Sequence, residues 1–569
     1  MCVRWLMFCL VSVPFVVPFR WYPDGDFFSD TIAVFFALLF VIASKELRCS
    51  SLVLIGFSLA GLILVAGVLG GSAYMEAWLA PALMVLVGSL FLGSMHARDP
   101  AELQRDWDAV LYGLVLGGGC SLVLGLGQIF EWGWISFLTF DGAIGVVANI
   151  GGRNQFSLYV LLGFLAFLVL LVRSALSVWW RCAVVVVVAS LCSFVLVSSG
   201  SRSVVLMVFS VLVLAIFRLY FWRNDRFSYY FLIFAGVFFL TQLLSVLWPD
   251  YFSAVDGGSG FSRIQNAYAD TRWVEWAKAW SIFLEHPFGV GFGNYAFFSF
   301  AATQMPSLVW SNPHNVILHF LVETGFVGAA LIVFGFVVVT VGCFRYLRMA
   351  EGGVILPAAI GSFILHNLLE YSFWYANFFL CFLIFLAFLP TSGRVLRFVS
   401  GRVVSLVFLV LLLVSAVQYC RLLSAVWLPD SKSRVARIVV SAQVGLNPFL
   451  SWRADKVFMD FIPYDDGPDL VVRFCRLEDM ARREPLPQYL ERMAFLAMVA
   501  EDHDLYGGIL KARYRRLSDT SGYYFESAVK TAWPLAAERV IRDFKERKLE
   551  GFKSYEEYQL GESGVCDGG

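Results

Sequence analysis

Polar residues able to do chemistry occur in the segment SNPHNVILHFLVETG, residues 311–325, between two apolar regions. His314 and Asn315 stand where an apolar helix is expected to begin, and Glu323 lies about two turns inside it. The imidazole of His314 could accept a proton from a hydroxyl nucleophile or orient one. Burying a carboxylate in a membrane helix is costly, so Glu323 is predicted to orient a donor or bind an acceptor. A lone histidine at a helix start is more often structural, so the role of His314 depends on its neighbours.

Three arginines flank apolar runs or loops rich in Gly, Asn or Ser. Arg153 is in NIGGRNQFSLY, Arg202 in SSGSRSVV and Arg272 in DTRWVEWAKAW. The planar fork of arginine matches the oxygens of phosphate and pyrophosphate. One such arginine is better explained as a residue that extends toward the membrane interface. All three lie on the side of the membrane whose loops contain few basic residues, and together they favour a pocket for an anionic lipid headgroup. Beside such a pocket, His314 is predicted to be catalytic.

Another cluster, His366, Glu370 and Tyr371, occurs in FILHNLLEYSFWYANFF. The four-residue spacing of His366 and Glu370 predicts that they share one face of a helix. An aromatic belt at the membrane interface explains Trp374 and Tyr375 but not the His and Glu before them. Upstream, the glycines of HPFGVGFGNY allow close approach of the backbone.

The elements that position these residues are predicted to be membrane helices. Of 569 residues, 59% are hydrophobic and only 15% are charged, against about 25% charged residues in soluble domains. Thirteen apolar runs approach the ~20 residues that span a bilayer as a helix. They are residues 4–19, 27–44, 50–70, 77–94, 109–130, 155–172, 182–198, 204–217, 229–248, 315–342, 353–369, 373–390 and 403–420. The predicted fold is an all-α polytopic membrane helix bundle with about 12–13 transmembrane helices.

The distribution of Lys and Arg in the loops predicts a cytoplasmic N-terminus. Fifteen of these residues then lie in inside segments and six in outside loops, Arg263 among the six. The three arginines, His314 and the turn after His366 then share the outer face. Residues 1–420 are predicted to form the transmembrane domain, with 249–314 as its large outer loop.

The remaining residues, 421–569, have a different composition and hold 22 of the 43 Lys and Arg. The patterns PQYLERMAFLAMVAEDHD and GGILKARYRRL are amphipathic and predict a soluble helical domain. With a cytoplasmic N-terminus, thirteen spans place this domain on the outer, periplasmic side of the membrane. The eleven cysteines include no CxxC pair and no Cys/His spacing suited to zinc. The sequence therefore predicts no disulfide framework and no metal site.

Four motifs in order resemble the O-antigen ligase and Wzy polymerase superfamily over about residues 145–390. They are GGRNQFSLYV, SGSRSVVL, HPFGVGFGNY followed by NPHNVILHFLVETGFVG, and LHNLLEYSFWYANFFL. The last is similar to a segment that marks the PglL/PilO-type branch, the bacterial protein O-oligosaccharyltransferases. The soluble tail is also expected of that branch.

The resemblance implies transfer of an oligosaccharide from undecaprenyl pyrophosphate to Ser or Thr of an exported protein, such as a type IV pilin. The reaction would occur at the periplasmic face of the inner membrane, with no metal, cofactor or nucleic acid partner. Arg202 and Arg272 would bind the pyrophosphate, and His314 would activate the acceptor hydroxyl beside Asn315. Tyr371 matches a tyrosine of the branch.

The entrance to the sixth span, with Arg153, Asn154 and Gln155, resembles a helix entrance of the same branch. The family has Gln before the Arg-Asn pair, where this chain has Gly152, and Gln155 is the candidate substitute. With His366 and Glu370, these residues are predicted to bind substrate.

Two other functions remain open from the sequence. A lipopolysaccharide O-antigen ligase or an O-antigen polymerase would share the arginines and the His-Asn loop, although the soluble tail and the HNLLEYSFWYANF segment argue against both. A secondary transporter would concentrate polar residues at the middle of the membrane in two similar halves. Here the polar residues gather at one face, and no internal duplication is visible.

Overall fold

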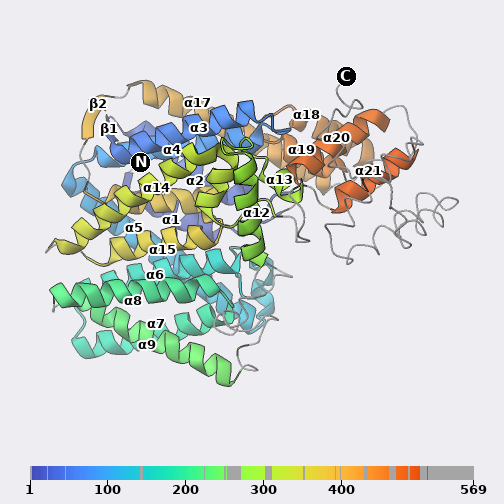
Figure 1. Ribbon diagram of the computed structural model, residues 1–569. Coiled ribbons are helices and arrows are strands. Elements are labelled where there is room, and N and C mark those ends of the chain that lie inside the picture. Colours follow the sequence, from blue (N-terminus) through green and yellow to red (C-terminus); the bar gives the residue numbers. More distant parts are fainter. Residues whose placement is uncertain are drawn as a thin grey trace.

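The computed structural model is an α-helical bundle with a smaller group of helices at one end (Figure 1). It describes residues 3–21, 23–44, 46–140, 145–222, 225–248, 252, 271–301, 310–349, 353–390, 393–397, 399–427, 433–459, 470–484, 487–499 and 509. Arg263, much of the predicted outer loop and the GGILKARYRRL pattern lie outside the described residues, apart from Ile509.

Every predicted span corresponds to a helix, and the all-α polytopic membrane fold is confirmed. The bundle helices are α1 (Val3–Val16), α2 (Phe27–Ala43), α3 (Ser51–Leu69), α4 (Glu76–His96), α5 (Pro100–Ile129), α6 (Arg153–Arg173), α7 (Val178–Ser198), α8 (Arg202–Phe221), α9 (Arg226–Leu247), α14 (Val316–Arg348), α15 (Ile355–Leu369), α16 (Ala376–Ala387) and α17 (Val399–Val426). Within the described residues, nine of these are long and apolar enough to cross a membrane, and four are shorter apolar helices.

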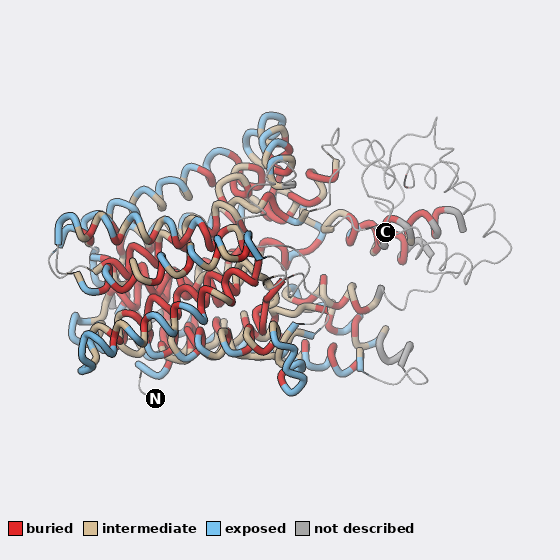
Figure 2. Tube along the Cα trace, turned by 90° about the horizontal axis from the view of Figure 1, so that it is seen from below, coloured by how far each residue is buried: buried red, intermediate tan, exposed pale blue. Residues whose placement is uncertain are grey.

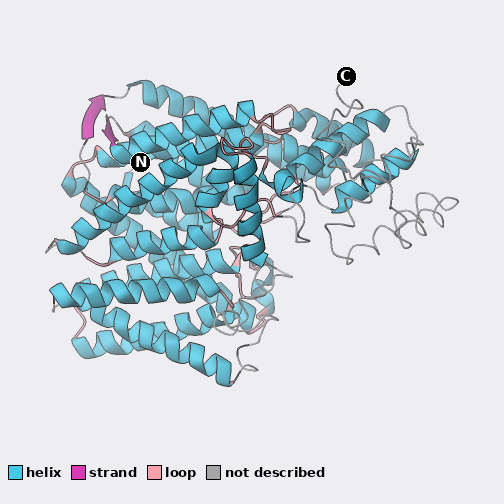
Figure 3. Ribbon diagram, viewed as in Figure 1, coloured by secondary structure: helices cyan, strands magenta, loops and turns pink. Residues whose placement is uncertain are grey.

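The two ends of the bundle make separate sets of contacts. At one end, strands β1 (Glu46–Ser50) and β2 (Gly393–Arg397) pair antiparallel (Figure 3). At the other end, which we call the site face, Arg20 Nε donates to the Asn149 carbonyl at 2.8 Å, and Asn294 Nδ2 donates to the Gly70 carbonyl at 2.9 Å. Both contacts join loops predicted to lie outside, in agreement with the predicted alternation of the helices.

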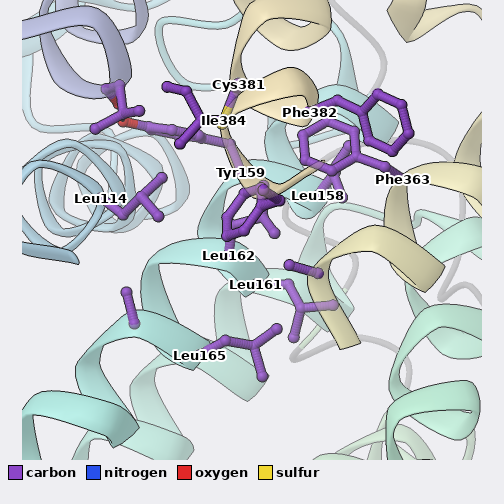
Figure 4. Close-up of a cluster of buried hydrophobic side chains, with 14 of the residues drawn as sticks. Leu114, Leu158, Tyr159, Leu161, Leu162, Leu165, Phe363, Cys381, Phe382 and Ile384 are labelled. Atoms are coloured by element: carbon purple, nitrogen blue, oxygen red, sulfur yellow. The ribbon is translucent and has the colours of Figure 1, made fainter. Parts of the chain in front are cut away.

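The core follows helix α6, and Figure 4 shows Leu158, Tyr159, Leu162 and Leu165 of this helix within it. The Tyr159 hydroxyl donates to the Val11 carbonyl of α1 at 2.7 Å. Figure 2 shows buried residues along the middle of the bundle and exposed ones on its outer helices. Large apolar side chains on that exterior are suited to contact lipid.

A glycine-rich loop at the site face fits into a break in helix α14. It joins α12 (Thr271–Glu285) to α13 (Tyr295–Ala301). Gly325 has non-helical angles (φ 69°, ψ −166°), which interrupts the helical hydrogen bonds. Backbone amides of Val290 and Gly291 donate instead to the carbonyls of Val322 and Glu323, at 2.9 and 3.1 Å. The loop therefore satisfies buried carbonyls that the break exposes.

Replacing Gly291 with alanine is expected to destabilise the protein by about 2 kcal/mol or more. Its φ is 92°, and an added Cβ would lie 2.3 Å from the Cα of Gly70. The midpoint of thermal unfolding in detergent measures the effect. Gly61→Ala is the matched control, because a Cβ there meets nothing within 4 Å, and alanine favours the helix by up to about 1 kcal/mol. Equal midpoints for the two variants would contradict the predicted packing.

The chain after the bundle forms α18 (Ser433–Gly445), α19 (Ser451–Met459), α20 (Leu470–Arg483) and α21 (Pro487–Val499). Helix α17 continues to Val426, past the predicted boundary at residue 420. Cys475 in α20 is disulfide-bonded. The sequence analysis predicts no disulfide framework and gives no sign of this single bond, because sequence spacing does not identify a pair that is formed by tertiary structure.

Candidate active site at one end of the helix bundle

Glu370 is the centre of a cluster formed by residues from distant parts of the sequence. Its Oε1 accepts a hydrogen bond from Asn154 Nδ2 at 2.6 Å and also pairs with Arg272. Its Oε2 lies 3.4 Å from Nδ1 of His314. The side chain of Glu370 is only 6% exposed. We call these residues, with Arg153 and Arg202, the Glu370 cluster.

The position of Glu370 corrects the prediction that it shares a helix face with His366. Helix α15 ends at Leu369, and Glu370 is extended (φ −146°, ψ −164°). Asn367 stabilises the turn that follows, because its Oδ1 accepts from the backbone amide of Phe373 at 2.8 Å. The extended residue directs the carboxylate toward α6 and α12 instead of along α15. His366 remains inside α15 and is fully buried.

The turn before α14 holds His314 in a defined position. His314 has a positive φ of 51°, and its backbone amide donates to Asn312 Oδ1 at 2.9 Å. Asn315 caps α14 by accepting from the amides of Ile317 and Leu318, and its Nδ2 donates to the Leu368 carbonyl at 3.0 Å. The cap therefore joins the start of α14 to the end of α15. This observed role of Asn315 is structural, and its predicted catalytic role stays a prediction.

Aromatic side chains enclose the same turn. Trp276 Nε1 donates to the Pro313 carbonyl at 2.9 Å. The rings of Trp310 and His314 meet edge to face, with centroids 4.1 Å apart. Helix α12 thus supplies both Arg272 and a contact that fixes the histidine turn.

The three predicted arginines belong to one electrostatic environment. The charges of Arg202, Arg272 and Glu370 all act on Arg153. Arg153 and Arg202 are the first residues of α6 and α8, where the helix dipole is positive. Ser201 Oγ donates to Asn154 Oδ1 at 2.7 Å and so joins the two helix ends. With three guanidinium groups and one carboxylate, this region suits a phosphate or pyrophosphate group.

The cluster keeps the Glu370 carboxylate ionised. Burial alone would raise the pKa of Glu370, but His314 and Arg272 more than offset burial and hold this pKa below its ordinary value. The stability that the ionised group contributes is therefore present at neutral pH. It is lost only as the pH falls through the lowered pKa.

Other predicted site residues lie outside this cluster. Glu323 and Tyr371 line a cavity of about 570 Å³, together with His319 and Trp374. Gln155 lines a separate cavity of about 190 Å³ with Arg20 and Tyr375. A Cβ at Gly152 would lie 2.3 Å from Gln155 Oε1, so the absence of a side chain at residue 152 makes room for Gln155. The structure therefore divides the predicted residues between the Glu370 cluster and two cavities.

His319 is a candidate that the sequence analysis missed. Its Nε2 lies 3.0 Å from Glu323 Oε2, and both side chains are buried. The other carboxylate oxygen, Oε1, accepts from the backbone amide of Tyr295 at 2.9 Å. The signal was available, because a His and a Glu four residues apart within a helix lie on one face.

Comparison with known proteins covers part of this site. Residues 187–333 match the O-antigen ligase family model. The match supports a relationship between this chain and the O-antigen ligase superfamily. The matched segment covers less than half of the chain and includes Arg202, Arg272, His314 and Glu323. The match also supports an activity for the protein, the transfer of a glycan from a lipid-linked donor. No curated protein and no solved structure matches the chain.

Proposed function

We propose that the protein transfers an oligosaccharide from undecaprenyl pyrophosphate to a Ser or Thr of an exported protein such as a type IV pilin. The reaction would take place at the periplasmic face of the inner membrane. The observation that carries the proposal is the Glu370 carboxylate, which contacts Arg272 and His314 through its two oxygens. These contacts support the proposal because they bring together Arg272, the proposed pyrophosphate ligand, and His314, the proposed proton acceptor.

The cluster fits a direct displacement at the anomeric carbon of the donor sugar. The acceptor oxygen forms a bond to this carbon as the bond to the pyrophosphate oxygen breaks, and the pyrophosphate leaves with the electron pair. Arg153, Arg202 and Arg272 stabilise the charge that develops on it. His314 faces Glu370 through Nδ1, so its Nε2 takes the hydroxyl proton. Glu370 orients the imidazole and stabilises the cation that forms.

A protein acceptor is favoured by features outside the matched segment. HNLLEYSFWYANFF, residues 366–379, supplies Glu370 and Tyr371 and resembles the protein-glycosylating branch. The disulfide at Cys475 fits an oxidising compartment, as the periplasm is, and so supports the place of the reaction but not the choice of acceptor. The family match instead favours a second candidate, lipopolysaccharide O-antigen ligation. A deletion strain distinguishes the two candidates: loss of a mass shift on pilin supports the first, and loss of smooth lipopolysaccharide supports the second.

Single Arg202→Ala and Arg272→Ala variants are each expected to lower the transfer rate about 10²- to 10³-fold, because each removes a cation that faces the leaving group. The rate is measured by intact-protein mass spectrometry of the acceptor, at equal amounts of enzyme in the membrane. Arg173→Ala is the control, since Arg173 pairs with Asp108 in an exposed ion pair away from the site. Wild-type transfer by a normally inserted Arg202→Ala or Arg272→Ala variant would refute the role of that arginine.

A further inference from the structure

The cavity of about 570 Å³ beside the Glu370 cluster has an apolar and a polar part. The apolar part is formed by Leu38 of α2, Met84 and Val87 of α4, and Phe408 and Leu412 of α17. From Asp30 to Leu38, both in the lining, helix α2 rises about 12 Å. The cavity therefore extends from the site face well into the bundle.

The charges around the polar part do not suit an anionic ligand. Among the described residues, five carboxylates line the cavity, against three Lys and Arg side chains. The carboxylates are Asp24, Asp30, Glu76, Glu323 and Glu484, and the basic residues are Arg453, Lys456 and Arg483. The guanidinium of Arg453 already pairs with Asp24 and Glu76. Lys456 pairs with Glu484, and Arg483 donates to the Gly293 carbonyl. A phosphorylated glycolipid would have to displace these contacts, whereas a polypeptide segment without charged side chains would not.

A buried imidazole lies at this polar end. His319 is 4% exposed, and within the described residues neither ring nitrogen has a hydrogen bond of good geometry, although Nε2 lies close to Glu323. Buried polar groups normally have partners, so His319 is suited to bind a polar group that enters the cavity. Ser311 also lines the cavity, and Tyr371 directly follows Glu370. The polar end thus borders the Glu370 cluster.

The C-terminal helices complete the cavity. Trp452, Arg453 and Lys456 of α19 and Arg483 of α20 are part of its lining. Arg483 also donates to the Gly293 carbonyl of the glycine-rich loop at 3.1 Å. These helices therefore form a wall of the space next to the proposed catalytic residues.

We infer that this cavity is the acceptor site and that its occupant is an apolar polypeptide segment, with the acceptor Ser or Thr at its polar end. The inference rests on the proposed function and adds the location and chemistry of the second substrate. The apolar part of the segment lies between α2, α4 and α17, and His319 binds a polar group next to the acceptor hydroxyl.

Photo-crosslinking of the full-length protein in lipid nanodiscs tests the site. Leu412, which lines the cavity, is replaced by p-benzoylphenylalanine, and Leu413, which is 47% exposed and outside the lining, is the matched control position. The probe is a tagged synthetic peptide with an apolar stretch of about 16 residues and a serine-rich end. About tenfold more crosslinking is expected at residue 412 than at residue 413, and none with a peptide whose apolar stretch is replaced by Gly and Ser.

Tagged lipid A and tagged undecaprenyl pyrophosphate are tested in parallel. Equal peptide crosslinking at the two positions, or capture of either lipid instead of the peptide at residue 412, would overturn the inference. A second measurement uses His319→Gln, which is expected to raise KM for the peptide about tenfold with little change in kcat, because one hydrogen bond is lost. An unchanged KM would overturn the role of His319. Crosslinking needs no donor, so specific capture without glycan transfer would refute the proposed function and not the binding site.

Discussion

Replacing Glu370 with glutamine is expected to lower the rate of glycan transfer about 10³- to 10⁴-fold, by analogy with other carboxylates that orient a catalytic imidazole. Glutamine has nearly the same shape but no charge, so it no longer stabilises the His314 cation or pairs with Arg272. Removing one partner of a buried ion pair also leaves the other uncompensated. Transfer to the acceptor is measured at saturating donor, together with the amount of enzyme in the membrane.

A double variant tests whether Glu370 acts through His314. His314→Ala alone should lower the rate by a similar factor, and Glu370→Gln combined with His314→Ala should be little worse than either, since residues that act as a unit are not additive. Glu370→Asp keeps the charge and is expected to retain part of the activity. If the double variant instead lowers the transfer rate by the product of the two single factors, the residues act independently and Glu370 does not act through His314.

The membrane helices are predictable from sequence because the cost of burying polar groups in lipid restricts each span to a long apolar run. The ends of the helices are less predictable. The run 373–390 was expected to be one span, but α16 begins only at Ala376, and Ser372–Trp374 form a short 3₁₀ turn. Aromatic residues at a membrane interface are as apolar as those of a helix, so composition does not distinguish the two.

The sequence identifies most of the residues at the candidate site, but it does not show which of them lie together. The spacing of His366 and Glu370 matches a helix face, yet α15 ends between them. The same spacing at His319 and Glu323 does lie within one helix, α14. The rule holds only inside a helix, so its outcome depends on a helix end that the sequence leaves uncertain. Directly after that helix end, the extended Glu370 joins the arginines, whereas its neighbour Tyr371 lines the cavity.

No local pattern predicts the charge network that attaches the C-terminal helices to the bundle, because its members are far apart in the sequence. Arg453 Nε donates to Asp24 Oδ2 at 2.7 Å, and its Nη1 lies 3.4 Å from Glu76 Oε1. Burial would raise the pKa of Asp24, but the charge of Arg453 more than offsets it and lowers this pKa. The Tyr74 hydroxyl also donates a hydrogen bond to Asp455 Oδ2 at 2.8 Å.

Replacing Arg453 with alanine is expected to destabilise the contact between the C-terminal helices and the bundle by about 3 kcal/mol. This value is at the lower end of the destabilisation observed when one partner of a buried ion pair is removed, because the Asp24 side chain is still 25% exposed. The Glu76 side chain is only 7% exposed. Faster proteolysis of the segment after α17 measures the loss, with thermal unfolding of the bundle as a second measurement. Transfer should also fall, because α19 forms part of the proposed acceptor site.

A charge-free triple variant separates loss of the pair from loss of its charge. In Asp24→Asn, Glu76→Gln and Arg453→Met combined, no buried charge is left without a partner, and such replacements are often neutral for stability. Protection from proteolysis should therefore recover to near that of the wild type. If the triple variant is as sensitive as Arg453→Ala, the uncompensated carboxylates are not the cause, and the loss of the net attraction between Arg453 and its two carboxylates explains the effect instead.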